Sequence, residues 1–175
     1  METKVLNKKL LASSWKLKLF EDELLLPSGK IQFTPRFSLP DFVIVVAFRK
    51  SDGSIPLVNQ YRHGSRAKMW ELPAGHIEPQ EKLADCAKRE FREEVGFELL
   101  RPKLICSAYT SAPRSRQRAR IFMGYVGKKV KQKLDETEYL TVKFASSNVA
   151  ERLLARKVSA SHLLAFLLAR EKGLF

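Results

Sequence analysis

Three glutamates in the middle of the chain have the residue type and the spacing to bind a divalent cation. Glu90, Glu93 and Glu94 stand at positions i, i+3 and i+4, so on a helix their carboxylates share one face. Like charges at this spacing repel and destabilise a helix, and a hard cation with oxygen ligands offsets the repulsion. We therefore expect these glutamates to hold Mg²⁺ or Mn²⁺, the alternative being a solvated acidic face.

The glutamates belong to an acidic stretch of a strongly basic chain. The 175 residues hold 19 acids against 32 Lys and Arg, a formal net charge of +13. In residues 75–97 the acids outnumber the bases, which supports a cation site there. Elsewhere the positive charge favours polyanionic partners such as nucleotides or nucleic acid, or it serves solubility alone. The acids of the stretch are Glu78, Glu81, Asp85, Glu90, Glu93 and Glu94.

A helix must position these carboxylates. Pro79 suits the first helical turn, where its missing N–H is not needed, and Gly96 suits the residue just past the end. We therefore predict a helix of about four turns between them. Its apolar stripe repeats at helical spacing: Leu83, Ala87, Phe91 and Val95.

Residues 75–97 also resemble the Nudix box, with no departure at its defining positions. The resemblance implies a mixed sheet between helices, an α/β sandwich, and metal-dependent hydrolysis of a diphosphate bond with Mg²⁺ or Mn²⁺ as the cofactor. It assigns metal binding to Glu90, Glu93 and Glu94 and to the backbone carbonyl of Ala74. The matching positions are Gly75, Glu81, Arg89, Glu90, Phe91, Glu93, Glu94, Gly96 and Phe97.

Further residues receive catalytic or supporting roles from this resemblance. Glu81 and Arg89 are expected to tie the loop and orient the metal-binding glutamates, and Arg89 and Glu93 count among the catalytic residues. Glu136 or Glu138 is expected to accept the proton of the attacking water. The alternative is that the two acids are ordinary loop charges.

Outside the box, the chain resembles the branch of ADP-ribose pyrophosphatases and nucleotide-sugar diphosphatases. This implies a small-molecule substrate, ADP-ribose or a related nucleotide sugar, and it places Tyr61 and Arg62 at the substrate. As aromatic residues, Tyr61 and Trp15 could instead belong to the core. The resemblance is carried by the strand end Gln60-Tyr61-Arg62, the segment Trp70–Gly75, Pro113, and the acidic loop Leu134–Glu138.

One segment departs from that branch. Its members usually follow the proline with Gly and then an acid, whereas here arginines alternate after Pro113. If the segment is extended, Arg114, Arg116 and the next two arginines share a face. They would then bind substrate phosphates, or form a basic edge that discourages aggregation.

Two other functions remain open at this stage. The positive charge and the arginine run favour a Nudix hydrolase that acts on nucleoside triphosphates or on the 5′ end of RNA. A non-catalytic nucleic-acid-binding module is the alternative from another class, although the intact box argues against it.

The expected organisation is a β-rich module at residues 1–40, forming a homodimer, followed by the Nudix domain at 41–175. The apolar run Phe42–Phe48 is typical of a strand buried on both faces. Other strands are predicted at 15–20, 31–37, 55–61, 99–108, 116–126 and 139–145, and helices at 147–156 and 159–172.

Composition excludes several classes of protein. The chain has no run of 18 apolar residues and no secretory signal pattern at its N-terminus, so we expect a cytoplasmic protein without a membrane partner. Its two cysteines, Cys86 and Cys106, are expected to be reduced thiols. The three histidines are scattered and suggest no nucleophilic triad.

Overall fold

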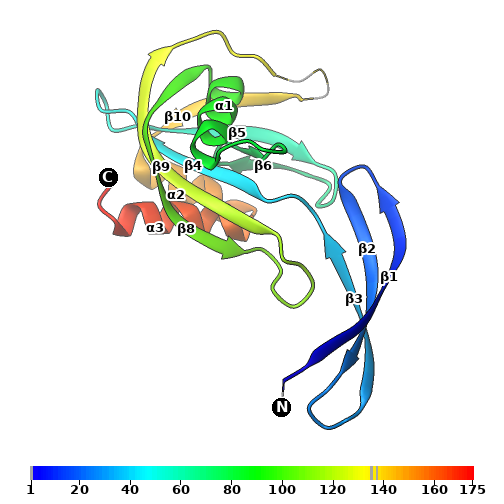
Figure 1. The fold of residues 1–175 in the computed structure, drawn as a ribbon. Helices are drawn as coiled ribbons and strands as arrows, with labels where there is room; N and C mark the ends of the chain where they lie inside the picture. The colour runs from blue at the N-terminus through cyan, green and yellow to red at the C-terminus, as the bar shows by residue number, and fades with distance from the viewer. Residues whose placement is uncertain (1, 135, 137) are drawn as a thin grey trace. The chain divides into compact units, whose positions relative to one another are not determined.

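The computed structural model describes residues 2–134, 136 and 138–175, which form two compact units. The smaller unit contains the described residues up to Asp41 together with Tyr109–Arg118. The larger unit contains Phe42–Ala108 and Ala119–Phe175. Figure 1 shows the chain coloured along its length.

The smaller unit is built on an antiparallel sheet in the order β1-β2-β3. Its strands are β1 (Lys4–Ser14), β2 (Leu17–Leu25) and β3 (Ile31–Ser38). β1 lies outside the predicted strands, because it is exposed at every position and so carries no apolar alternation. A half-buried ion pair between Asp22 and Arg36 joins β2 to β3.

The larger unit contains two further sheets, and one of them is mixed. The first has the order β7-β4-β9-β8, in which β4 runs parallel to β9 and antiparallel to β7. The second has the order β10-β5-β6 and is antiparallel. The strands are β4 (Phe42–Phe48), β5 (Ile55–Arg62), β6 (Ala67–Glu71), β7 (Ala74–His76), β8 (Phe97–Tyr109), β9 (Arg118–Lys129) and β10 (Leu140–Ala145).

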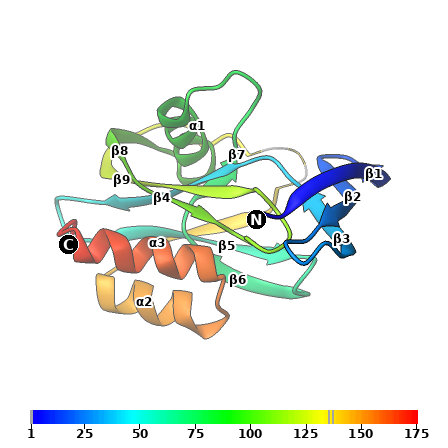
Figure 2. The same cartoon turned by 60° about the horizontal axis from the view of Figure 1, so that its bottom comes forward.

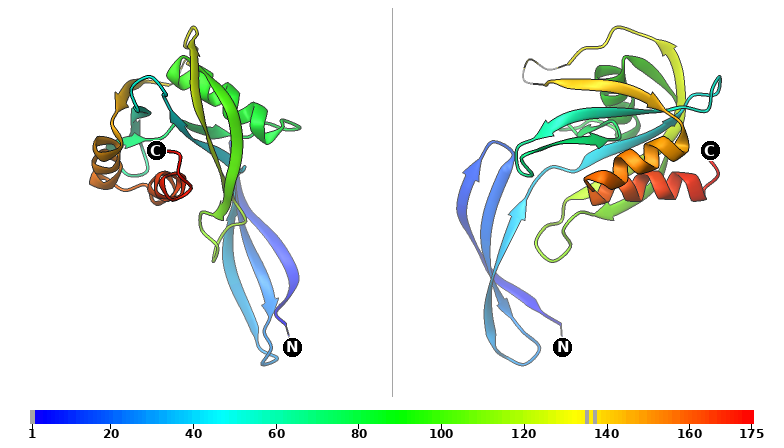
Figure 3. Two further views of the ribbon diagram at one scale, coloured as in Figure 1. Left: turned by 90° about the vertical axis from the view of Figure 1, so that its left-hand side faces the viewer. Right: turned by 180° about the vertical axis from the view of Figure 1, so that it is seen from behind.

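Strand β4 separates two apolar cores, as its sequence predicted. Ile44 and Val46 pack into one core with residues of α2 (Ser147–Arg156) and α3 (Ala160–Glu171). Val43, Val45 and Ala47 alternate with them and pack into the other core, under α1 (Leu83–Val95). Figure 2 shows α2 and α3 side by side, and Figure 3 shows α1 across the strands from them. The α/β class and the mixed sheet are confirmed.

The box helix starts later than predicted. It begins at Leu83, so the expectation that Pro79 lies in its first turn is wrong. Gln80 has a φ of 65°, which no right-handed helix can contain, and the Glu78 N–H donates to the Glu81 carboxylate instead. The predicted end is confirmed, because Gly96 adopts a φ of 75° and its N–H donates to the Arg92 carbonyl.

The arginine run is not the continuous strand that was considered. Strand β9 begins at Arg118, whereas Ser111–Arg114 form a turn closed by N–H donation from Arg114 and Ser115 to the Ser111 carbonyl. Of the four arginines, Arg118 and Arg120 therefore lie in β9, while Arg114 lies in the turn and Arg116 precedes the strand.

Two further features of the chain bear on its class. Cys86 is buried, Cys106 is partly buried, and both are free thiols. Among the described residues, no helix has the length and apolar character that a membrane span requires.

Candidate active site

Two box glutamates lie against the short strand β7. The Glu94 carboxylate is almost fully buried and accepts a hydrogen bond of 2.9 Å from the Ala74 N–H. The Glu90 carboxyl occupies the space where a side chain at Gly75 would lie, since a Cβ built there would be 2.0 Å from it. Glycine at this position is therefore what allows Glu90 to approach the β7 backbone.

Arg89 holds the box together through one guanidinium. Its Nε and Nη2 donate to the two oxygens of Glu81 at 2.7 and 2.9 Å. Its Nη1 donates to Glu90 and Glu93 at 2.7 and 3.1 Å, and Nη2 also donates to the His76 carbonyl. One cation thus pairs with three carboxylates and ties the loop to the helix, and its bonds to Glu81 lower the pKa of that carboxyl to about 2.

The two carboxyl groups that lie against β7 have raised pKa values. Burial, together with the charges of Glu93 and Glu138, raises the pKa of Glu90 to about 7 against the pull of Arg89. Burial raises the pKa of Glu94 well above its usual range, and the charges of Glu90 and Glu138 raise it further. Because repulsion between carboxylates contributes to both shifts, a bound cation would relieve part of it.

The donor chemistry fits a hard divalent cation. Carboxylates and a backbone carbonyl, the set made by Glu90, Glu93, Glu94 and Ala74, are the ligands that Mg²⁺ and Mn²⁺ prefer. Within the described ranges, however, no three His, Cys, Asp or Glu side chains are grouped so as to hold a metal ion. In this arrangement Arg89 supplies positive charge to Glu90 and Glu93.

The two candidate general bases behave differently. Both Glu136 and Glu138 are exposed, and the placement of the residues that flank Glu136 lies outside the described part of the chain. The charge of Glu138 raises the pKa of both Glu90 and Glu94, so Glu138 interacts electrostatically with these two box carboxylates. Which of the two accepts a proton stays a prediction.

Of the two candidate substrate residues on β5, Arg62 acts electrostatically on Glu94. It is half-exposed and forms a 2.7 Å ion pair with buried Glu71, and its charge lowers the pKa of Glu94. Tyr61 is 54% exposed and lies edge-on to His63. Trp15 is 79% exposed, so neither aromatic belongs to the core.

Arg114 and Arg116 belong to the smaller unit. Both are exposed, and Arg114 donates to the Pro35 carbonyl. Of the later arginines, Arg118 stacks on Tyr109 and Arg120 donates to Ser107. A role for Arg114 and Arg116 in substrate binding stays a prediction.

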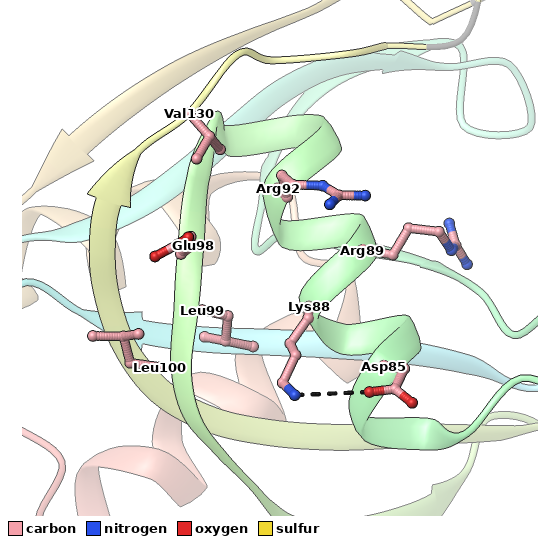
Figure 4. Close-up of a pocket in the computed structure, with 8 residues that line it drawn as sticks. All are labelled: Asp85, Lys88, Arg89, Arg92, Glu98, Leu99, Leu100 and Val130. Carbon is pink, nitrogen blue, oxygen red and sulfur yellow. Dashed lines mark ion pairs between the residues drawn. The ribbon is translucent and has the colours of Figure 1, made fainter.

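A pocket of about 390 Å³ lies beside α1, and Arg89 is one of the residues that line it. Lys88 and Arg92 of the helix line it together with Leu99 and Leu100 of β8, as Figure 4 shows. Glu90 and Glu94 do not line it, and Lys88 is engaged by Asp85 at 3.7 Å. The pocket therefore meets the box through Asp85 and Arg89 and not through Glu90 or Glu94.

Sequence reasoning missed a buried polar pair behind the box. His162 and Glu71 are each less than 5% exposed, and His162 Nε2 lies 3.7 Å from a Glu71 oxygen. Glu71 lies in the segment Trp70–Gly75 that carried the branch resemblance, but neither residue was given a role. A sequence signal for His162 was its place beside the apolar run from Leu163 to Ala169.

Comparison with known proteins decides the family. The NUDIX domain family matches residues 39–164, most of the chain. The chain belongs to the Nudix family. Its box, mixed sheet and helices are those expected for a Nudix pyrophosphohydrolase, and the chain is such an enzyme.

Two relatives and one solved structure indicate which branch of the Nudix family this enzyme resembles. An ADP-ribose pyrophosphatase of Bacillus subtilis (strain 168) is 28% identical over 144 residues, 81% of this chain and 77% of the relative. Another, of Mycobacterium tuberculosis, is 32% identical over 106 residues, 60% of this chain but only 51% of the relative. The crystal structure of an ADP compounds hydrolase has the same fold, with a TM-score of 0.86 and 21% identity over 98% of this chain and 94% of that one.

The raised pKa of Glu90 predicts that Glu90→Gln stabilises the metal-free protein at pH 8 more than at pH 5. The folded pKa of about 7 exceeds the ordinary 4.5, so ionised Glu90 costs stability as pH rises through that window. We expect a gain of roughly 1–3 kcal/mol in the free energy of unfolding at pH 8, measured by urea denaturation with a chelator present. Asp85→Asn, an exposed change on the same helix, is the control. An equal gain at both pH values would contradict the prediction.

Proposed function

We propose that this Nudix enzyme hydrolyses the diphosphate of ADP-ribose or a related nucleotide sugar, using Mg²⁺ or Mn²⁺. The products would be a nucleoside monophosphate and a sugar phosphate. The observation that carries the proposal is the convergence of Glu90 and Glu94 on Ala74–Gly75 within the field of Glu138. The names of the two bacterial relatives support the substrate class.

The roles follow from the chemistry of each group. Glu90, Glu93, Glu94 and the Ala74 carbonyl would hold the cation, which supplies Lewis-acid stabilisation of charge on the phosphate oxygens. Glu138 accepts the proton of the attacking water as general base. Glu81, through Arg89, fixes the box loop relative to the helix.

We assign substrate binding to Arg62, Tyr61, Arg114 and Arg116. Arg62 is held by buried Glu71 yet remains 42% exposed, so its free donors can bind a phosphate. Tyr61, beside it on β5, offers an exposed ring to a base or sugar. Arg114 and Arg116 would add phosphate contacts.

We expect Glu94→Gln to reduce kcat at least about 100-fold, because a metal-ligand charge is lost where several kcal/mol of transition-state stabilisation arises. Glutamine can still accept the Ala74 N–H, so the far-UV circular dichroism spectrum should be unchanged. Released AMP from ADP-ribose with Mg²⁺ is the measurement. The pair Glu138→Gln and Glu136→Gln serves as a matched comparison, with a large loss expected only for the first. Near wild-type turnover of Glu94→Gln would contradict the metal role.

A second substrate class is favoured by the net charge of +13. If the enzyme acts on the 5′ end of RNA, binding should weaken steeply with salt, since each neutralised phosphate releases counterions. A nucleotide sugar has few phosphates, so we expect KM for ADP-ribose to change by less than about tenfold between 50 and 200 mM KCl. A panel of nucleotide sugars, triphosphates and 5′-triphosphorylated RNA, assayed at both salt concentrations, separates the two classes.

We also propose that the smaller unit forms a homodimer. One face of β2 and β3 carries exposed apolar side chains, because residues paired across an antiparallel ladder share a face. An apolar face of this kind is typical of an interaction surface. Its members are Leu17, Leu19, Ile31 and Phe33, at 37–61% exposure.

This proposal predicts a dimer by sedimentation velocity at micromolar concentration, and a shift toward monomer for Phe33→Lys. Burial of a phenylalanine is worth about 1.5–3 kcal/mol per subunit, so its loss should weaken dimerisation at least about tenfold. Val158→Lys changes an exposed apolar residue of the larger unit and is the control. A monomeric wild-type protein would contradict the proposal.

A further inference from the structure

A buried histidine on the last helix contacts the segment that leads into the Nudix box. His162 is 4% exposed, and its Nδ1 accepts a hydrogen bond of 3.1 Å from the Leu72 N–H. The two residues are 90 positions apart, and Leu72 itself is fully buried. Because no water reaches this N–H, loss of the imidazole would leave a buried donor unsatisfied.

The contacts of His162 fix its tautomer. Burial lowers the pKa of His162 to about 4, so the ring is neutral at pH 7. Since Nδ1 accepts a hydrogen bond, the single ring proton lies on Nε2, which faces buried Glu71 at 3.7 Å. Glu71 in turn accepts bonds from Arg62 Nε at 2.8 Å and from Gln60 at 3.2 Å. The histidine thus contacts the backbone that leads into the box and also faces the carboxylate that holds Arg62.

The backbone after Leu72 passes directly to the glutamates. Pro73 has no N–H, so the Leu72 and Ala74 amides are successive donors along the chain. The first donates to His162 and the second to Glu94. The Pro73 carbonyl between them accepts from the Val45 N–H at 2.9 Å. This short segment is therefore held by α3, β4 and α1 in consecutive residues.

We propose that His162 is a positioning residue for the active site, which fixes the Leu72–Ala74 backbone and thereby holds the Glu94 carboxylate in place. Its importance for metal binding rests on the proposed function of Glu94. The backbone restraint itself does not, because it is defined by the contacts of His162 and Ala74 in the metal-free chain. The simpler alternative is a core histidine whose loss lowers stability without affecting the box.

Three variants separate positioning from general stability. His162→Leu removes the acceptor while keeping an apolar group of similar size. His162→Asn retains an acceptor near the position of Nδ1. Phe166→Leu alters a fully buried neighbour on the same helix, and it reports what loosening α3 does by itself.

The first measurement is amide hydrogen exchange in the metal-free protein, followed by NMR. In His162→Leu the Leu72 and Ala74 amides should exchange at least about tenfold faster relative to amides of the central strand β4. His162→Asn should restore their protection, and Phe166→Leu should leave the ratio unchanged. An Ala74 amide that remains as protected in His162→Leu as in wild type, or that responds equally to Phe166→Leu, overturns the inference.

The second measurement is the dissociation constant for Mn²⁺ by calorimetry. Removal of residues behind metal ligands typically weakens binding about 10–100-fold, and we expect the low end of that range for His162→Leu, with rescue in His162→Asn. Glu94→Gln is the reference for a lost ligand. If Glu94→Gln binds Mn²⁺ like wild type, the proposed metal role of Glu94 fails. Hydrogen exchange of the Ala74 amide is then the only test of the positioning role of His162. If Glu94→Gln weakens Mn²⁺ binding and His162→Leu does not, the inference that His162 holds the Glu94 carboxylate in place is overturned.

Discussion

The arrangement of the box depends on one guanidinium that serves three carboxylates. Without Arg89, the charges of Glu81, Glu90 and Glu93 would repel across a single helical face and the preceding loop. With it, Glu81 stays ionised and fixes the loop, while Glu90 and Glu93 remain near a position where a cation can compete for them. A permanently charged side chain suits this task, because arginine does not lose its proton when partly buried.

The rest of the larger unit holds in place the helix and the backbone that carry Arg89 and its carboxylate partners. β4 is apolar on both faces, so it anchors α1 on one side and α3 on the other. The Leu72–Gly75 segment crosses between these layers and contacts each of them through its backbone. A site built on such a segment is held by hydrogen bonds from several elements, which keeps charged groups that repel one another in place.

Much of the fold could be predicted from local patterns in the sequence. The alternating cores of β4 and the C-terminal cap at Gly96 were predicted because burial on two faces and a left-handed cap leave direct marks in sequence. The helix start was mispredicted, because Pro79 is compatible with a first turn and only the bond from Glu78 to Glu81 favours the loop. Strand β1 was missed because no face of it is buried.

The sequence by itself determined the family and the identity of the box carboxylates, since their spacing is fixed within one helix. Tertiary structure alone decided which groups meet them. The Ala74 amide reaches Glu94 across 20 residues, and His162 reaches Leu72 across 90. It also brought the charge of Glu138 to act on Glu90 and Glu94, because the field of a charge depends on distance in space. Contacts of this kind have no local signature, since they arise only when β4 brings distant segments together.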